Sequence, residues 1–231
     1  MAVEPLASSV ANTLGARIVA GDLGLGDVIR LDDIDEEFGV SRSVSREAVK
    51  ILESHNFVRS RRRVGVLILA PHEWDLMAPR VIGWHLAGPH RLEEMRWLSQ
   101  LRGAIEPMAA RLAAGQAHRD HIGAVVEAAS AMDEVARARD FDRLLRADIE
   151  FHTGVLVASG NPLFAAQARV VGAVLEGRAR HLPYDPRPEA IELHGEVARC
   201  VAVGDGAGAE QAMRAIVDEA RQAVETDSAK G

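Results

Sequence analysis

The chain has 231 residues, which suits one large domain or two modest ones, and 48% of them are hydrophobic while only 4% are aromatic. A core of this composition consists mainly of Ala, Leu, Val and Ile, and Ala-rich stretches favour helix. No apolar run approaches the roughly 18 residues of a membrane span, and the first residues do not resemble a secretory signal, so we expect neither feature. Cys200 is the single cysteine, so no intrachain disulfide is expected. We therefore expect a soluble, cytoplasmic protein that is mainly α.

The net charge of −7 is unevenly distributed. Residues 1–37 carry two basic and eight acidic side chains, whereas residues 38–70 carry seven basic and two acidic ones. A basic segment within an acidic chain confines any contact with nucleic acid to one face. An ordinary solvated surface has charge clusters too, so the motif that carries these charges must decide.

Apolar residues at every fourth position from Leu6 to Ile18 predict a first helix. The spacing from Leu31 to Phe38 predicts a second, short helix that stops at Gly39, and a third begins near Ser41 or Ser43. Two short β-like runs follow, over 57–61 and 64–69. This order of elements predicts a winged helix-turn-helix over residues 1–70.

The second part of the chain is predicted to be almost entirely helical. Three prolines punctuate residues 71–89 and predict a linker with short helices. Helices are then expected near 91–115, 119–138, 141–159, 162–181, 187–203 and 207–226. Because the loops between them are short, residues 90–231 are predicted to form an antiparallel all-α helical bundle.

The basic residues of the 38–70 segment lie where a helix-turn-helix contacts DNA. The third helix has an apolar side and an opposite side on which basic residues recur every four positions, and the first turns of such a helix contact base edges in the major groove. The residues expected to contact bases are Arg42, Ser43, Ser45 and Arg46, and Lys50 is expected to contact a phosphate. The residues expected to form the wing on the DNA backbone or minor groove are Arg61, Arg62, Arg63 and Gly65.

The stretch GVSRSVSREA, residues 39–48, resembles the GVSRTPVREAL signature of the GntR regulators, and residues 52–58 are similar to the segment that follows it there. The remainder resembles the FadR-type subgroup, whose C-terminal ligand-binding (FCD) domain is all-helical. The resemblance implies a transcription regulator, expected to be a repressor, that binds a double-stranded operator as a homodimer. It also implies that the helical bundle of residues 90–231 serves effector binding and dimerisation. One position departs from the family: Asp32 stands where an Arg commonly contacts DNA.

Asp148 and His152 are spaced four residues apart, so both project from one helix face, and a carboxylate with imidazoles suits Zn²⁺, Ni²⁺ or Mn²⁺. Residues 148–152 and 159–162 resemble the subgroup's "D..FH…SGNP" segment, and His194 matches its next metal ligand. A further His of that site is replaced by Ile216. Two hypotheses stay open: a metal whose shell an effector oxygen completes, or a pocket that binds an organic acid through hydrogen bonds alone.

Arginines are expected to hold the effector. Arg102 matches a pocket-facing position of the subgroup, where a guanidinium can bind a carboxylate through two parallel hydrogen bonds. Arg221 is a second candidate. Residues 82–88 are similar to a stretch of the galactonate-operon-type repressors, a branch that answers to sugar acids. The resemblance implies a small carboxylate effector such as an aldonate, bound with Asp148, His152 and His194.

Two other functions are compatible with the Asp148, His152 and His194 set besides a ligand-controlled repressor. A dedicated metal sensor would use Asp148, His152 and His194, and so would a small metallohydrolase. The chain has no H-E-x-x-H, P-loop, G-x-S-x-G or dinucleotide-binding motif. The sequence therefore predicts a regulator rather than an enzyme.

Overall fold

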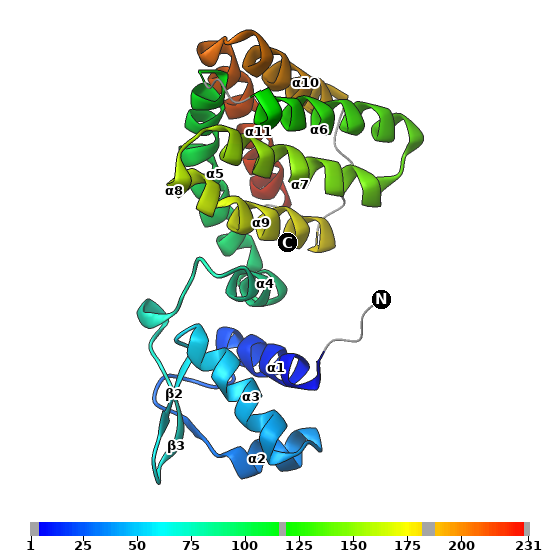
Figure 1. Ribbon diagram of the computed structural model, residues 1–231. Helices are drawn as coiled ribbons and strands as arrows, with labels where there is room; N and C mark the ends of the chain where they lie inside the picture. The colour runs from blue at the N-terminus through cyan, green and yellow to red at the C-terminus, as the bar shows by residue number, and fades with distance from the viewer. Residues whose placement is uncertain (1–4, 116–118, 182–187, 229–231) are drawn as a thin grey trace. The chain divides into compact units, whose positions relative to one another are not determined.

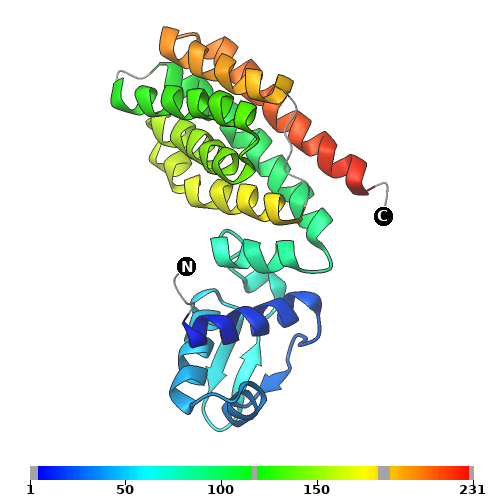
Figure 2. The same cartoon turned by 90° about the vertical axis from the view of Figure 1, so that its right-hand side faces the viewer.

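The computed structural model describes residues 5–115, 119–181 and 188–228, and the chain divides into two compact units between Arg91 and Leu92 (Figures 1 and 2). The first unit consists of α1 (Leu6–Ala20), β1 (Val28–Ile29), α2 (Leu31–Phe38), α3 (Arg42–Ser54), β2 (Val58–Arg61), β3 (Gly65–Ile68), a 3₁₀ turn (Pro71–Glu73) and α4 (Pro79–Ala87). β3 lies between β1 and β2 and is antiparallel to both. The predicted winged helix-turn-helix is confirmed.

The helices of the first unit share one core with the sheet. Along α1 the predicted spacing holds for Val10, Leu14 and Ile18, which are buried, while Leu6 at the helix start is exposed. The apolar sides of α2 and α3 meet α1 in this core, through Ile34 and Leu52. Burial of these aliphatic side chains fixes which sides of α2 and α3 remain in water.

The stretch 71–89, expected to be a linker, folds onto the first unit. Pro79 occupies the first turn of α4, where a missing N–H costs nothing, so the proline begins a helix there. Trp84 of α4 is buried in the core of the first unit, and its Nε1–H donates to Asn12 Oδ1 of α1 at 3.0 Å. A Cβ added at Gly15 would lie 2.5 Å from the Trp84 ring, so α1 and α4 approach closely only because residue 15 is glycine.

The second unit is an all-helical bundle, as predicted. It consists of α5 (Arg91–Ala114), α6 (Arg119–Ala138), α7 (Phe141–Ala158), α8 (Pro162–Ala166), α9 (Ala168–His181), α10 (Pro188–Val203) and α11 (Gly206–Ser228). α6 packs beside α7 and α10, α7 beside α9, and α10 beside α11 (Figures 1 and 2). The single helix expected over 162–181 is divided into α8 and α9 at Gln167. No helix within the described ranges is long and apolar enough to cross a membrane.

The core of the second unit is aliphatic and rich in alanine, in keeping with the composition. A group of buried polar side chains interrupts this core. Its members come from α5, α7 and α10: Arg102, Glu106, Asp148, His152 and His194. Because burying charged groups is costly unless they are paired, this group is a candidate ligand site.

Candidate functional site

The turn between α2 and α3 orients the third helix of the first unit. Gly39 ends α2 with φ +60°, a left-handed conformation that glycine adopts without strain. The Val40 amide donates to the Asp35 carbonyl at 3.1 Å, and Ser41 precedes the first residue of α3. The turn therefore keeps α2 and α3 in fixed relation while their apolar sides enter the core.

The outer side of α3 carries the predicted cations. Arg42, Ser43, Arg46 and Lys50 are all exposed. Lys50 pairs with Glu47 at 2.7 Å, and Arg42 donates to Asp35 of α2 at 3.1 Å and also to Asp32. The face therefore presents a row of guanidinium and ammonium groups, one of which is held by carboxylates of the preceding helix.

The prediction that Ser45 contacts a base edge is wrong. Ser45 is fully buried, and its hydroxyl donates to the Asp35 carboxylate of α2. It lies one turn after Arg42 on the side of α3 that meets α2, and both residues contact Asp35, so the role of Ser45 is to tie the two helices together.

The β2–β3 hairpin presents the predicted wing. Arg61, Arg62 and Arg63 are exposed at its tip, and Arg63 has φ +65°. Gly65 has φ +128°, and a Cβ there would lie 2.7 Å from Val28 and 2.8 Å from the Ile29 carbonyl oxygen. Gly65 therefore lets β3 approach β1. The sequence predicts that Gly65 contacts DNA, and the structure gives it this role in the sheet.

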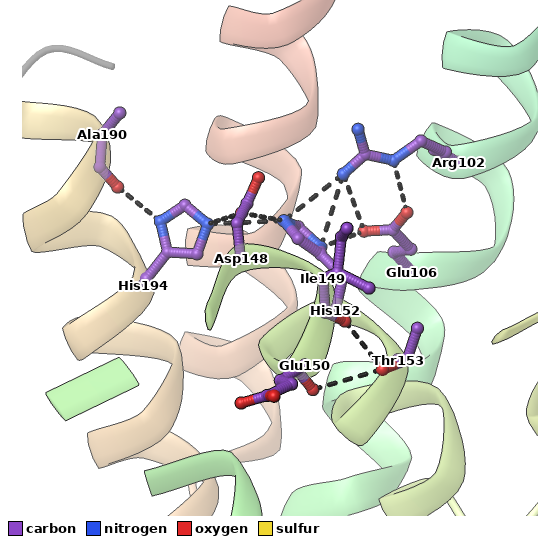
Figure 3. A network of polar contacts seen from close by, with 9 residues as sticks. All are labelled: Arg102, Glu106, Asp148, Ile149, Glu150, His152, Thr153, Ala190 and His194. Atoms are coloured by element: carbon purple, nitrogen blue, oxygen red, sulfur yellow. Dashed lines mark hydrogen bonds and ion pairs between the residues drawn. The ribbon is translucent and has the colours of Figure 1, made fainter. Parts of the chain in front are cut away.

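The buried polar group of the second unit is arranged around His152 (Figure 3). The Nε2 atom of His152, the Nε2 atom of His194 and the Oδ1 atom of Asp148 lie 3.3 Å from one another in each of the three pairs. All three side chains are buried. These residues form a set of potential metal ligands among the described residues.

The other ring nitrogen of each histidine is already committed. His194 Nδ1 lies 2.6 Å from the Ala190 carbonyl oxygen, which only accepts hydrogen bonds, so this nitrogen carries the proton. His152 Nδ1 lies 2.6 Å from Glu106 Oε2 and donates to that carboxylate. Both rings therefore turn an Nε2 atom toward Asp148, in the orientation that a metal-ligating histidine requires.

Glu106 links this triad to Arg102. The Arg102 guanidinium donates from Nε to Glu106 Oε1 at 2.6 Å and from Nη2 to Oε2 at 3.3 Å. Its Nη2 atom also lies 3.4 and 3.3 Å from the two ring nitrogens of His152. The bidentate grip expected of Arg102 on an effector carboxylate is thus made with a carboxylate of the chain itself (Figure 3).

The charges of this group stabilise one another. Burial opposes ionisation of Glu106, but Arg102 and His152 outweigh it and lower the pKa of the carboxyl to about 2. Burial also opposes ionisation of Asp148, yet hydrogen bonds from His152 and His194 hold its pKa well below the ordinary value. Burial disfavours the imidazolium form of His152, but the Glu106 carboxylate outweighs this and the pKa of His152 is raised. Both carboxylates are therefore ionised at neutral pH.

Comparison with known protein families assigns both units. Residues 6–68 match the family described as "Bacterial regulatory proteins, gntR family", and residues 98–219 match the FCD domain. The chain belongs to the GntR family. It is a DNA-binding transcription regulator with an FCD domain and not an enzyme, because regulators of this family are transcription factors.

Curated relatives cover most of this GntR chain. It is 27% identical over 205 residues to the "Galactonate operon transcriptional repressor" of Escherichia coli (strain K12), covering 87% of this chain and 88% of the relative. It is 28% identical over 212 residues to the "Probable D-xylose utilization operon transcriptional repressor" of Paenarthrobacter nicotinovorans, covering 90% and 84%. The solved structure "Streptococcus agalactiae GntR" is similar in fold, with a TM-score of 0.53 at 21% identity over 94% of this chain and 99% of that one.

The FCD domain brings four of the predicted sensor residues together, and Arg221 is not among them. Arg221 lies on α11, pairs with Asp218 at 3.3 Å and Glu225 at 3.2 Å, and lines a separate surface groove of about 290 Å³. Ile216 is buried in the apolar core of the domain. Arg221 therefore cannot share a ligand with the triad through the groove that it lines.

Sequence reasoning did not identify Glu106, which is fully buried and connects Arg102 to His152. Its spacing of four residues from Arg102 was a usable signal, because side chains at that spacing meet on a helix. The contact with His152, a residue of another helix, leaves no trace in the spacing.

Proposed function

We propose that this regulator is a repressor whose affinity for operator DNA is controlled by a small carboxylate effector, anchored at a divalent transition metal held by Asp148, His152 and His194. The relative from E. coli is named as the repressor of a galactonate operon, and galactonate is a sugar acid. A repressor of this kind senses the acid in one domain and holds DNA with the other.

The observation that carries this proposal is the equilateral arrangement of the three ligand atoms, 3.3 Å apart. Ligand atoms at the usual bond lengths from a tetrahedral Zn²⁺ lie about 3.3 to 3.5 Å from one another. Since both Nδ1 atoms are committed to acceptors, loss of the Nε2 protons that face Asp148 would leave two Nε2 lone pairs directed at a cation beside an ionised carboxylate. Three electron-pair donors that face one another in a buried site fit a cation.

Three protein ligands leave part of a metal's coordination shell to another donor. A bound divalent ion would supply a positive, Lewis-acidic anchor for an effector oxygen. Ile216, which replaces a family ligand, cannot donate a lone pair, so that donor must come from a small molecule or water. Because Glu106 neutralises Arg102 and Asp148 is ionised, the positive charge that favours an anionic effector over a neutral one would be that of the metal ion.

Thermal unfolding of the full chain tests this proposal. D-galactonate is expected to raise the melting temperature of Zn²⁺-loaded protein, because a ligand that binds only the native state stabilises it by about 2.7 kcal/mol at 100 times its Kd. Neutral D-xylose is the matched probe, since the relative from Paenarthrobacter nicotinovorans is named for a D-xylose operon. Asp148→Asn is expected to abolish the galactonate response.

Two outcomes contradict the proposal. If D-galactonate stabilises chelator-treated and Zn²⁺-loaded protein equally, the effector does not bind through a metal. If D-xylose stabilises the protein and no aldonate does, the effector is not a carboxylate. A second function, metal sensing, rests on the same triad, and it is favoured if Zn²⁺, Ni²⁺ or Mn²⁺ alone changes the affinity for DNA without any organic acid.

For the DNA contacts, we propose that Arg42, Ser43 and Arg46 face base edges, with Lys50 and the wing arginines on the backbone. Their exposure on α3 and on the β2–β3 tip supports this assignment. Arg46→Ala is expected to weaken binding to the preferred operator by about 1 to 3 kcal/mol and to relax the base preference at one position of each half-site. Arg137→Ala, an exposed arginine of α6 that pairs with Asp133, is the control and is expected to change neither.

We further propose a homodimer that places two α3 helices on a pseudo-palindromic operator, about 34 Å apart if the half-sites are one turn apart. Light scattering of the free protein gives its mass. A monomer that also binds DNA as a monomer would contradict this arrangement.

A further inference from the structure

The first arginine of α3 is held by two carboxylates of α2. Arg42 Nη1 donates to Asp32 Oδ1 and to Asp35 Oδ2, and the other oxygen of Asp35 accepts from the buried Ser45 hydroxyl. We propose that Asp32 and Asp35 are positioning residues that make Arg42 a sequence-discriminating contact rather than a general contact to DNA. This inference rests on the proposed placement of α3 against DNA.

The hydrogen bonds decide which edge of the guanidinium faces outward. An arginine has five N–H donors in one plane, and both donors on Nη1 of Arg42 are taken by carboxylates. The Nε–H and one Nη2–H remain as a parallel fork, the arrangement that binds O6 and N7 of guanine in the major groove. Because Asp35 is itself fixed by Ser45, the orientation of this fork is set before DNA arrives.

The same carboxylates reduce the general attraction of Arg42 for DNA. Attraction to phosphates depends on net positive charge and is independent of sequence, whereas hydrogen bonds to a base edge depend on donor geometry. Two carboxylates beside one guanidinium cancel its charge but leave its remaining donors. Arg46, which forms no ion pair with any residue in the described part of the chain, keeps its full charge for the general attraction.

Asp32 also opposes a swing of Arg42 from the base edge onto the phosphate backbone. Its side chain is 83% exposed, so on a helix next to DNA its carboxylate repels a nearby phosphate. A swing of Arg42 onto the backbone would give up the contacts with Asp32 and Asp35 and leave these charges near phosphates. The geometry thus favours the base edge as the partner of Arg42.

Asp32→Asn tests the proposal, because it removes one charge with almost no change of shape, and the exposure of Asp32 allows the chain to fold. The matched control is Glu36→Gln, which removes one charge from an exposed α2 residue that forms no ion pair with the residues described. Full-length wild type and both variants each select from a library of randomised duplexes about three helical turns long. Affinity for one mixed-sequence duplex is measured against salt in parallel.

We expect wild type and Glu36→Gln to select the same motif. Asp32→Asn is expected to lose preference at one base pair of each half-site by about fivefold or more, the least that a bidentate arginine contact contributes to discrimination. It is also expected to bind the mixed-sequence duplex more tightly, with a salt slope steeper by about 1, because the released Arg42 then contacts phosphate.

The role of Asp32 is overturned if Asp32→Asn selects the wild-type motif with the same strength and shows the salt slope of Glu36→Gln, or if wild type selects no motif. A wild-type protein that retains no duplex at low salt would instead overturn the placement of α3 on DNA. The two failures are therefore distinguishable.

Discussion

Glu106 neutralises the charge of Arg102 and fixes the tautomer of His152 in the sensor site. It is fully buried, accepts two hydrogen bonds from Arg102 and accepts a third from Nδ1–H of His152. Without this carboxylate, Arg102 would be a buried cation with its main counter-ion removed, and the tautomer of His152 would no longer be fixed.

Glu106→Gln is accordingly expected to lower the free energy of unfolding by about 3 to 5 kcal/mol, the usual consequence of breaking a buried ion pair. Its affinity for Zn²⁺ is expected to fall about 10- to 100-fold, as when an outer-shell partner of a ligand is lost. Denaturation followed by circular dichroism measures the first effect and Zn²⁺ titration the second. Glu210→Gln, on a surface carboxylate paired with Arg111 and Arg214, is the control and is expected to change neither. A Glu106→Gln variant as stable as this control would contradict the assigned role.

At the residue scale the sequence predicted more of the sensor than of the DNA face. Resemblance to a family placed Arg102, Asp148, His152 and His194, which the structure brings together. Glu106 and Asp35 act through residues on other helices, so helical spacing alone did not identify them. Ser45 is predicted to contact a base edge because it lies in the first turns of the third helix, and only the tertiary contact with α2 shows that it is buried.

At the scale of elements, the contact between α1 and α4 depends on the absence of a side chain at Gly15. The Trp84 ring occupies the place of a Cβ at this position. Replacing Gly15 with alanine would raise the helix propensity of α1, because alanine is the better helix former. The same replacement would overpack the contact with Trp84, so the two effects on stability oppose each other.

Gly15→Ala is expected to destabilise the first unit by about 1 to 3 kcal/mol, because the overpacking penalty exceeds the gain in helix propensity. Gly83→Ala on α4 meets nothing within 4 Å and is expected to stabilise by up to about 1 kcal/mol. Urea unfolding followed by tryptophan fluorescence reports on both, since Trp74 and Trp84 lie in this unit. If Gly15→Ala and Gly83→Ala shift stability in the same direction, the close contact between Gly15 and Trp84 does not determine the effect of Gly15→Ala.

Helix and strand periodicity predicted most of the elements, and the misses have physical reasons. The prolines of 71–89 predicted a linker with short helices, and Pro79 begins one, α4; its docking on the core of the first unit through Trp84 has no signal in the proline pattern. The break at Gln167 was missed because no glycine or proline marks it.

At the scale of the whole molecule, two histidines couple the stability of the first unit to pH. Burial lowers the pKa of His55, against a smaller contribution from Asp75, and burial with His90 lowers the pKa of His85. In the unfolded chain both return to about 6.5. Below that pH the unfolded state binds more protons than the folded state, so stability falls as the pH is lowered.

The urea midpoint of the tryptophan signal is therefore expected to decrease from about pH 7.5 to about pH 5.5. His55 stacks edge-on against Trp84 at 5.9 Å, and His55→Phe is expected to show a smaller decrease. His72→Gln, an exposed histidine of the same unit, is expected to keep the wild-type decrease. A wild-type midpoint independent of pH would contradict this assignment.

We propose that the FCD domain of this regulator holds a metal at Asp148, His152 and His194. Calorimetric titration of Zn²⁺ into chelator-treated, full-length protein tests it most directly, with His194→Gln beside wild type and His72→Gln as the control. We predict one ion per chain for wild type and His72→Gln and loss of this binding in His194→Gln. Wild-type protein that binds none of Zn²⁺, Ni²⁺ and Mn²⁺, or a His194→Gln variant that binds as wild type does, would show that these three residues hold no metal.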